Sequence, residues 1–208
     1  MKLYTFPVSP NSLRVVAVAN QAHIDLEIVP VDLTKGEQMK PEFLAMNPNH
    51  KIPTLVDGDF VLWESTAIML YLAELKPRSK LVPKERAERM HMFKWITWNL
   101  TELQPACVTL QFERFVKKLF NLGDPDPKEV EKAEGNFHRY AKVLNEHLAG
   151  REWLVGTTIT LADHHVASSL VHAEPAGMPL AGYDHIRNWT RRVFETKAWK
   201  KALKALRH

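Results

Sequence analysis

Short apolar runs alternate with amphipathic segments over the first 75 residues. Four runs are brief and rich in β-branched or aromatic side chains, which predicts strands: residues 2–6, 26–31, 54–56 and 60–63. Three segments carry apolar side chains at helical spacing, which predicts helices: residues 11–22, 41–46 and 66–75. The turn Asp57-Gly58-Asp59 joins the last two strands as a hairpin. The predicted order is βαβαββα, and we expect a first domain over residues 1–75.

The pattern changes at residues 76–84, which contain Pro77 and Pro83 and have no helical period. This composition is typical of a linker. We therefore expect a domain boundary there and a second domain over residues 85–208.

Every periodic segment after the linker has helical spacing. The first is long, residues 84–120, and Pro105 should kink it because proline lacks an N–H and clashes with the preceding turn. The next helices begin at Asp126 and at Thr160, and the last two are residues 185–196 and 198–206. The predicted fold class is an α/β domain followed by an all-helical domain.

The composition is that of a globular protein, with 45% hydrophobic and 25% charged residues. The single cysteine, Cys107, excludes an internal disulfide, a Cys-x-x-Cys redox centre and a cysteine-rich zinc site. No run approaches the roughly 18 apolar residues of a membrane span, and residues 1–7 lack the apolar core of a signal peptide. We therefore expect a cytosolic protein without a membrane segment.

The two halves differ in charge. Residues 1–75 hold 5 Lys and Arg against 9 Asp and Glu, whereas residues 76–208 hold 23 against 15. The cations are mixed with acidic residues and do not interleave with aromatic ones, so we expect no nucleic-acid partner. The adjacent His164 and His165 point to different faces of a helix, and no metal site is predicted.

The turn Ser9-Pro10-Asn11-Ser12 lies between the first strand and the first helix, where Ser9 suits the N-cap. Thioredoxin-like folds carry Cys-x-x-Cys at this turn, but both cysteine positions are serine here. A hydroxyl cannot exchange disulfides, yet it can donate a hydrogen bond to a thiolate near the helix dipole. The sulfur would then come from a ligand. The alternative is that Ser9 is only a helix cap.

Two further turns could bind a peptide-like ligand. In His50-Lys51-Ile52-Pro53, a cis bond before Pro53 would expose the Ile52 main chain, and the two cations could bind a carboxylate. Glu64 and Ser65 precede a helix, where Ser65 is the expected cap and the free N–H groups form an anion site. An acid beside a helix N-terminus matches an amino-acid zwitterion. Each turn, taken alone, has a purely structural alternative.

Together these segments resemble the cytosolic glutathione S-transferase superfamily. The matching stretches follow the family's order: SPNSLRV at residues 9–15, residues 31–48, HKIPTLV at residues 50–56, WESTA at residues 63–67 and TLAD at residues 160–163. The likeness covers essentially the whole chain. It is greatest to the serine-type phi, theta and delta groups and their bacterial relatives.

The resemblance implies a thioredoxin-like N-terminal domain that binds glutathione, an all-helical C-terminal domain and a homodimer. Ser9 would activate the glutathione thiol, with Asn11 and Ser12 as competing candidates. The glutathione-binding positions are Gln38, His50, Lys51, Ile52, Pro53, Glu64 and Ser65.

Within that set, the resemblance gives each position a part of the tripeptide. The Ile52 main chain would pair with the cysteinyl unit, before the family's cis proline at Pro53. Glu64 and Ser65 would hold the γ-glutamyl end. His50, Lys51 and Gln38 would lie near the glycyl carboxylate. Thr160 and Asp163 match a capping box that is structural.

The implied reaction is conjugation of glutathione to a small electrophile, whose pocket the helical domain would build with Trp98, Phe112 and Phe115. Two other functions stay open. The same site could reduce glutathione-containing disulfides as a reductase or peroxidase, with Asn11 or Ser12 at the sulfur. The chain could also be a binding module without turnover, although its intact clamp residues argue against this.

Overall fold

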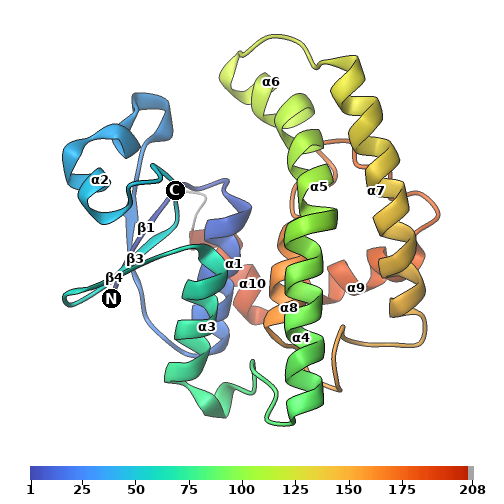
Figure 1. Cartoon of the computed structure of the whole chain (residues 1–208), viewed down its shortest axis with the longest axis horizontal. Helices are drawn as coiled ribbons and strands as arrows, with labels where there is room; N and C mark the ends of the chain where they lie inside the picture. The colour runs from blue at the N-terminus through green and yellow to red at the C-terminus, as the bar shows by residue number, and fades with distance from the viewer. Residues whose placement is uncertain (206–208) are drawn as a thin grey trace. The chain divides into compact units, whose positions relative to one another are not determined.

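The computed structural model describes residues 1–205 (Figure 1). The chain divides into two units, the first formed by residues 1–82 and the segment from Phe194 onward, and the second by residues 83–193.

The first unit is built on a four-stranded sheet in the order β2-β1-β3-β4. Its strands are β1 (Lys2–Thr5), β2 (Glu27–Pro30), β3 (Thr54–Asp57) and β4 (Phe60–Trp63). β1 pairs with β2 in parallel, and the other two pairs are antiparallel. These strands confirm the predicted succession of strands along the chain and the hairpin between β3 and β4.

Three α-helices complete the βαβαββα order: α1 (Pro10–Gln21), α2 (Pro41–Met46) and α3 (Ser65–Leu75). Figure 1 shows α1 and α3 on one face of the sheet and α2 on the other. The apolar stripe of α1, including Val15 and Val18, is buried with Ile68 and Leu72 of α3 and with Leu55 of the sheet. Short 3₁₀ turns cover Leu33–Lys35, Glu37–Met39 and Pro77–Ser79.

The last helix, α10 (Lys197–Ala205), belongs to the first unit, which departs from the expected domain over residues 85–208. α10 lies against α1, burying Ala198, Trp199 and Ala202, and Asn20 donates from Nδ2 to the Ala198 carbonyl at 3.1 Å. The amphipathic pattern predicts an apolar face but does not say which element covers it. Leu206, the predicted end of this helix, lies outside the described residues.

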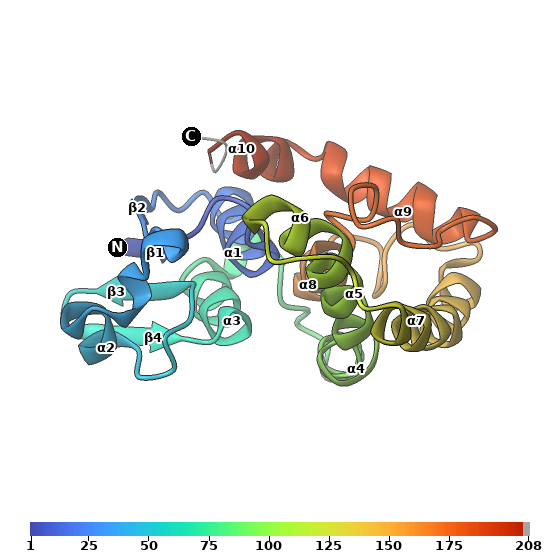
Figure 2. The same cartoon turned by 90° about the horizontal axis from the view of Figure 1, so that it is seen from above.

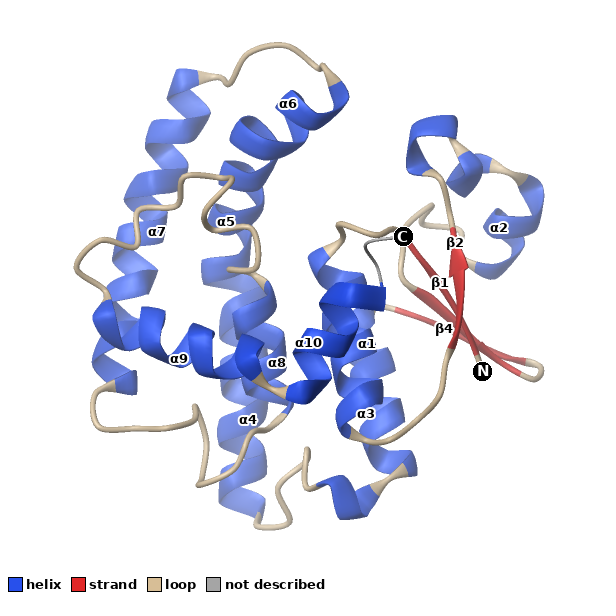
Figure 3. Cartoon of the chain, turned by 180° about the vertical axis from the view of Figure 1, so that it is seen from behind, coloured by secondary structure: helices blue, strands red, loops and turns tan. Residues whose placement is uncertain are grey.

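The second unit is helical, and no strand occurs among its residues 83–193 (Figure 3). Its α-helices are α4 (Arg86–Trp98), α5 (Gln104–Gln111), α6 (Lys117–Phe120), α7 (Pro127–Leu148), α8 (Leu161–Ser168) and α9 (Asp184–Glu195, which ends just past the boundary). Figure 2 views α4 and α7 nearly along their axes. α5 contacts α7, and α4 contacts α8.

The long helix predicted for residues 84–120 is interrupted by two π turns, Asn99–Leu103 and Phe112–Val116. The first π turn ends at Leu103, two residues before Pro105, and the Gln104 N–H donates to the Asn99 carbonyl. A proline removes one helical N–H, and widening the preceding turn changes which carbonyls need a donor. The helix therefore responds to Pro105 with a local change of hydrogen-bond spacing.

The predicted helix starts are correct at α7 and α8 but wrong at α3. Asp126 accepts from the Lys128 N–H at 2.9 Å, and Thr160 with Asp163 forms a capping box. At α3 the N-cap is Glu64, and Ser65 is the first helical residue. The Ser65 hydroxyl bonds to a side chain from α1 instead, so a partner distant in sequence overrides the local capping preference.

Candidate active site

Strand register brings the predicted binding turns to one end of the sheet. Thr54 of β3 lies opposite Tyr4 of β1 and Trp63 of β4. The turn with Ser9 follows β1, Pro53 directly precedes β3, and Glu64 directly follows β4. All three turns therefore leave the sheet at the same end of its strands, which we call the sheet edge.

The segment after β2 reaches this edge too. Thr5 pairs with Pro30, and the Val31 N–H donates to the Thr5 carbonyl at 2.7 Å. The 3₁₀ turn with Gln38 follows this segment. Gln38 is half-buried, and its buried Oε1 accepts no hydrogen bond from the described residues.

Ser9 is the N-cap of α1, as predicted. Its Oγ accepts a hydrogen bond from the Ser12 N–H at 3.3 Å. A hydroxyl has one hydrogen and two lone pairs, so this role as acceptor leaves the Ser9 hydrogen available as a donor. Ser9 is half-buried, so a ligand atom can reach it.

The two competing residues of this turn differ from Ser9 in exposure. Ser12 is completely buried, and its Oγ has no partner among the described residues. Asn11 is half-buried at the second position of α1. The burial of Ser12 disfavours it as a contact for a ligand sulfur.

The turn before β3 is organised by the buried side chain of Asn47. Asn47 Nδ2 donates to the Lys51 carbonyl at 2.7 Å and to Thr54 Oγ1 at 3.1 Å, and its Oδ1 accepts from the Asn49 N–H at 3.0 Å. The Ile52–Pro53 peptide bond is cis, as expected. Asn47 thus links the start of this turn to its end.

The cations of this turn point outward. His50 and Lys51 are both exposed, and His50 has a φ of 58°. His50 Nδ1 lies 3.0 Å from the Met39 sulfur, which joins this turn to the 3₁₀ turn that carries Gln38. The three residues expected near a glycyl carboxylate therefore lie on two connected turns.

The start of α3 combines an exposed acid with a buried hydroxyl. Glu64 is exposed, no side chain caps the helix there, and its φ of 68° is left-handed, which is unfavourable for a residue with a Cβ. Ser65 is buried, and its Oγ accepts from Arg14 Nε at 3.1 Å and from Nη2 at 2.6 Å. Backbone strain of this kind concentrates at functional sites, at about 1–3 kcal/mol each.

Arg14 and Asn47 have structural roles that were not predicted from the sequence. Both are about 2% exposed, and each joins parts of the site that are distant in sequence or separated by a turn. In the sequence, Arg14 is a charged residue within the apolar stripe of α1. Because a buried cation requires partners, this position could have indicated such a role for Arg14.

The aromatic residues predicted for an electrophile pocket have separate partners within the helical unit. Trp98 lies edge-on to Trp95 and Tyr140, with ring centroids 5.0 and 6.3 Å away. Phe115 lies 4.8 Å from the His172 ring, and Phe112 is 44% exposed beside the Lys117 ammonium. No ring contact among the described residues joins these three side chains to one another.

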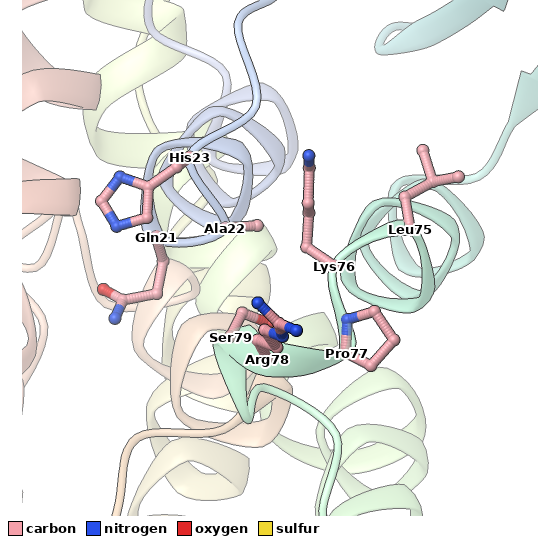
Figure 4. Close-up of a pocket in the computed structure, with 8 residues that line it drawn as sticks. All are labelled: Gln21, Ala22, His23, Leu75, Lys76, Pro77, Arg78 and Ser79. Atoms are coloured by element: carbon pink, nitrogen blue, oxygen red, sulfur yellow. The ribbon is translucent and has the colours of Figure 1, made fainter.

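A groove of about 590 Å³ lies at the opposite end of α1 from Ser9 (Figure 4). It is lined by the ends of α1 and α3 and the turn that follows α3, including His23, Lys76 and Arg78. This groove therefore does not coincide with the turns that converge at the sheet edge.

Other sites are not apparent in the described part of the chain. Cys107 is fully buried, and burial raises the pKa of its thiol well above the ordinary value, so the thiol is unreactive. Across residues 1–205, no three His, Cys, Asp or Glu side chains gather as a metal site would require. None of the helices described has the length and apolarity needed to cross a bilayer.

The thioredoxin-like unit and the helical unit together have the fold of a recognised class of protein. The family model for the glutathione S-transferase N-terminal domain matches residues 1–74, and that for the C-terminal domain matches residues 103–197. The chain therefore belongs to the cytosolic glutathione S-transferase superfamily.

Named relatives and solved structures agree with this assignment. Glutathione S-transferase 3 of Zea mays is 36% identical over 99% of this chain and 94% of its own length. Glutathione S-transferase D7 of Drosophila melanogaster is 30% identical over 99% and 90%. The solved structure of glutathione S-transferase-I bound to lactoylglutathione has a TM-score of 0.88 at 28% identity, covering 99% of this chain and 98% of the other.

Proposed function

We propose that this glutathione transferase ionises the glutathione thiol through a hydrogen bond from Ser9 and directs the thiolate at a small electrophile. The observation that supports Ser9 most strongly is its geometry. Its Oγ accepts from the Ser12 N–H, so its own hydrogen is free to donate to sulfur at the N-terminus of α1. With Ser9 in this role, the chain would be a serine-type member of the superfamily; its relation to the bacterial members stays a prediction.

Glutathione supplies the nucleophile in this reaction. The thiol proton leaves to solvent, and a carbon–sulfur bond forms as the leaving group departs with its electron pair or as the electrons move onto an acceptor atom of the substrate. The protein lowers the thiol pKa and holds the reactants together. A fall in pKa from about 8.5 to between about 6 and 7 requires roughly 2–3 kcal/mol of thiolate stabilisation.

The tripeptide is proposed to lie along the sheet edge. The Ile52 main chain would pair with the cysteinyl unit, Glu64 would bind the γ-glutamyl ammonium, and Ser65 would bind its carboxylate. His50, Lys51 and Gln38 would surround the glycyl carboxylate. The convergence of these turns at one edge supports this arrangement. Trp98, Phe112 and Phe115 are proposed to contact the electrophile.

We also propose that the protein is a cytosolic homodimer. The support is the exposure of large apolar side chains on β4, an edge strand of the sheet, where Phe60 is 47% and Trp63 40% exposed. A second copy of the chain would cover apolar side chains of this strand, since exposed apolar surface commonly marks interfaces. Light scattering on the wild type and Phe60→Lys would test this: a dimer converted to a monomer is expected, and a monomeric wild type would contradict it.

The function is tested with Ser9→Ala. Conjugation of a chlorodinitrobenzene-type substrate should fall at least tenfold, while the calorimetric affinity for glutathione changes less than about threefold. Ser12→Ala and Asn11→Ala are the matched variants, and neither should lower turnover as far. Unchanged turnover in Ser9→Ala would remove Ser9 as the activator. A parallel assay with a small disulfide would show whether the chain is a reductase instead.

A further inference from the structure

A buried arginine side chain connects α1 and α3, the two helices whose N-termini border the sheet edge. Arg14 lies on the apolar face of α1 and is 2% exposed. Its guanidinium reaches the first residue of α3, where Nε lies 3.1 Å and Nη2 2.6 Å from Ser65 Oγ. The same helix that presents Ser9 at its N-terminus therefore also holds Ser65.

These contacts determine how the Ser65 hydroxyl can interact with a ligand. A hydroxyl has two lone pairs and a single hydrogen, and two N–H groups of Arg14 are directed at its oxygen. Ser65 Oγ donates to no acceptor within residues 1–205. The hydroxyl is thus prepared to donate its hydrogen to a ligand acceptor, and a carboxylate oxygen is the strongest such acceptor in a peptide.

The charge of Arg14 acts in the same direction. Burial lowers the pKa of its guanidinium to about 9, and the Glu64 charge opposes that decrease, so Arg14 is positively charged at neutral pH. Its charge lies behind the N-terminus of α3, an end that already favours anions. Glu64, directly before α3, is exposed and available to a cation.

We propose that Arg14 is a positioning residue for glutathione: it fixes the Ser65 hydroxyl as a hydrogen-bond donor to the γ-glutamyl carboxylate. This inference rests on the proposed function, because it requires glutathione to bind along the sheet edge. Arg14 does not touch the ligand or the reacting sulfur. Its loss should therefore weaken glutathione binding and leave the chemical step intact.

Arg14→Lys is the decisive variant. Lysine keeps the charge but offers a single nitrogen on a flexible chain, so it cannot direct two N–H groups at one oxygen. We expect KM for glutathione to rise about tenfold while kcat at saturating glutathione changes less than threefold. Ser65→Ala should show the same loss, and the double variant should be no worse than either. Ser65→Thr, which restores a hydroxyl, should retain most of the affinity.

A ligand variant separates positioning from a general packing role. A glutathione analogue in which the γ-glutamyl α-carboxylate is amidated should bind the wild type about tenfold more weakly than glutathione does. Arg14→Lys should not weaken the binding of that analogue further. Arg191→Lys, at an exposed arginine of α9, is the control and should match the wild type.

The outcomes distinguish the inference from the function on which it rests. Equal glutathione affinity in the wild type and Arg14→Lys would overturn the positioning role. So would a lower thermal midpoint with an unchanged KM, since Arg14 would then be only structural. Failure of the wild type itself to bind glutathione would overturn both proposals. If Arg14→Lys does not fold, Arg14→Gln is measured in the same way, and an unchanged KM there would also overturn the role.

Discussion

Two helices of this protein begin with a hydroxyl residue and an acid, yet the two starts are built for different purposes. At α8 the Asp163 carboxylate is fully buried and accepts from the Leu154 and Thr160 N–H groups, from Thr160 Oγ1 and from Trp189 Nε1, at 2.9–3.0 Å. Its polar atoms are satisfied within the unit.

At α3 the arrangement is open. Glu64 is exposed in a left-handed conformation, and the Ser65 hydroxyl retains a hydrogen with no acceptor within residues 1–205. Polar groups that are satisfied internally stabilise the fold, whereas groups that are oriented but unsatisfied are available to a ligand. The comparison predicts that substitutions at α8 change stability and that substitutions at α3 change binding.

Asp163→Ala should have the largest effect. Removing the carboxylate leaves several buried donors without an acceptor, at about 1–3 kcal/mol each, so the free energy of unfolding should fall by at least about 3 kcal/mol. Urea denaturation measures the loss, and Thr160→Ala is the milder variant, at about 1 kcal/mol. Calorimetry on the folded fraction should find glutathione affinity unchanged. A selective loss of affinity at full stability would contradict the comparison.

The pH dependence of stability should show a second property of the α8 start. Burial lowers the pKa of His164 to about 3, so the unfolded chain binds a proton there that the folded chain does not. The stability that this residue contributes is therefore complete above pH ~6.5 and is lost as the pH falls. Between pH 7 and pH 5 the loss should be about 2 kcal/mol.

His164→Leu is the control for this dependence, because it removes the titrating group and keeps an apolar side chain. Burial also raises the pKa of Asp163, against the hydrogen bonds that it accepts, and this acts in the opposite sense because the folded state then holds its proton more tightly. That contribution is common to both proteins. Equal acid dependence of the wild type and His164→Leu in urea titrations would show that His164 is not responsible.

Substitutions of Glu64 test the role of the α3 N-terminus in glutathione binding. Glu64→Gly removes the carboxylate and relieves the left-handed backbone, so KM for glutathione should rise at least tenfold, or about 1.4 kcal/mol, without loss of stability. Glu64→Ala removes the same carboxylate but keeps the strain, and it should be less stable than the glycine variant by about 1 kcal/mol. Initial rates and thermal unfolding provide the two readouts. Equal stability of the variants would show that the conformation carries no cost.

The aromatic residues of the helical unit should give the smallest effects. Phe115→Ala and Phe112→Ala should change kcat/KM for a series of electrophiles about three- to tenfold and leave KM for glutathione within twofold. Trp98→Ala should also lower stability, because it loses edge contacts worth about 0.5–1.5 kcal/mol with Trp95 and Tyr140. An equal response from every electrophile would argue against a pocket role for these residues.

Local chemistry in the sequence was sufficient for much of the fold. The hairpin turn, the Asp126 cap, the Thr160–Asp163 box and the βαβαββα order follow from residues close together in the chain, and the structure has them all. Ser9 as the cap of α1 was predictable for the same reason. The candidate binding residues were recognisable because a family resemblance connected turns that are individually ambiguous.

The features that local sequence could not supply involve partners distant along the chain. The Arg14–Ser65 contact joins residues 51 positions apart, and it displaced the expected cap at α3. The apolar face of α10 was evident in the sequence, but its position against α1 was not.

The sequence by itself determined which segments form helices and strands, where most of them begin and which side chains are candidates for the chemistry. Those properties depend on backbone preferences and on hydrogen bonds within a few residues. Tertiary structure alone decided that four turns meet at one sheet edge, that Ser12 is buried while Ser9 is accessible, and that the Ser65 hydroxyl is oriented from α1. These depend on strand register and burial, which form only when distant segments exclude water together.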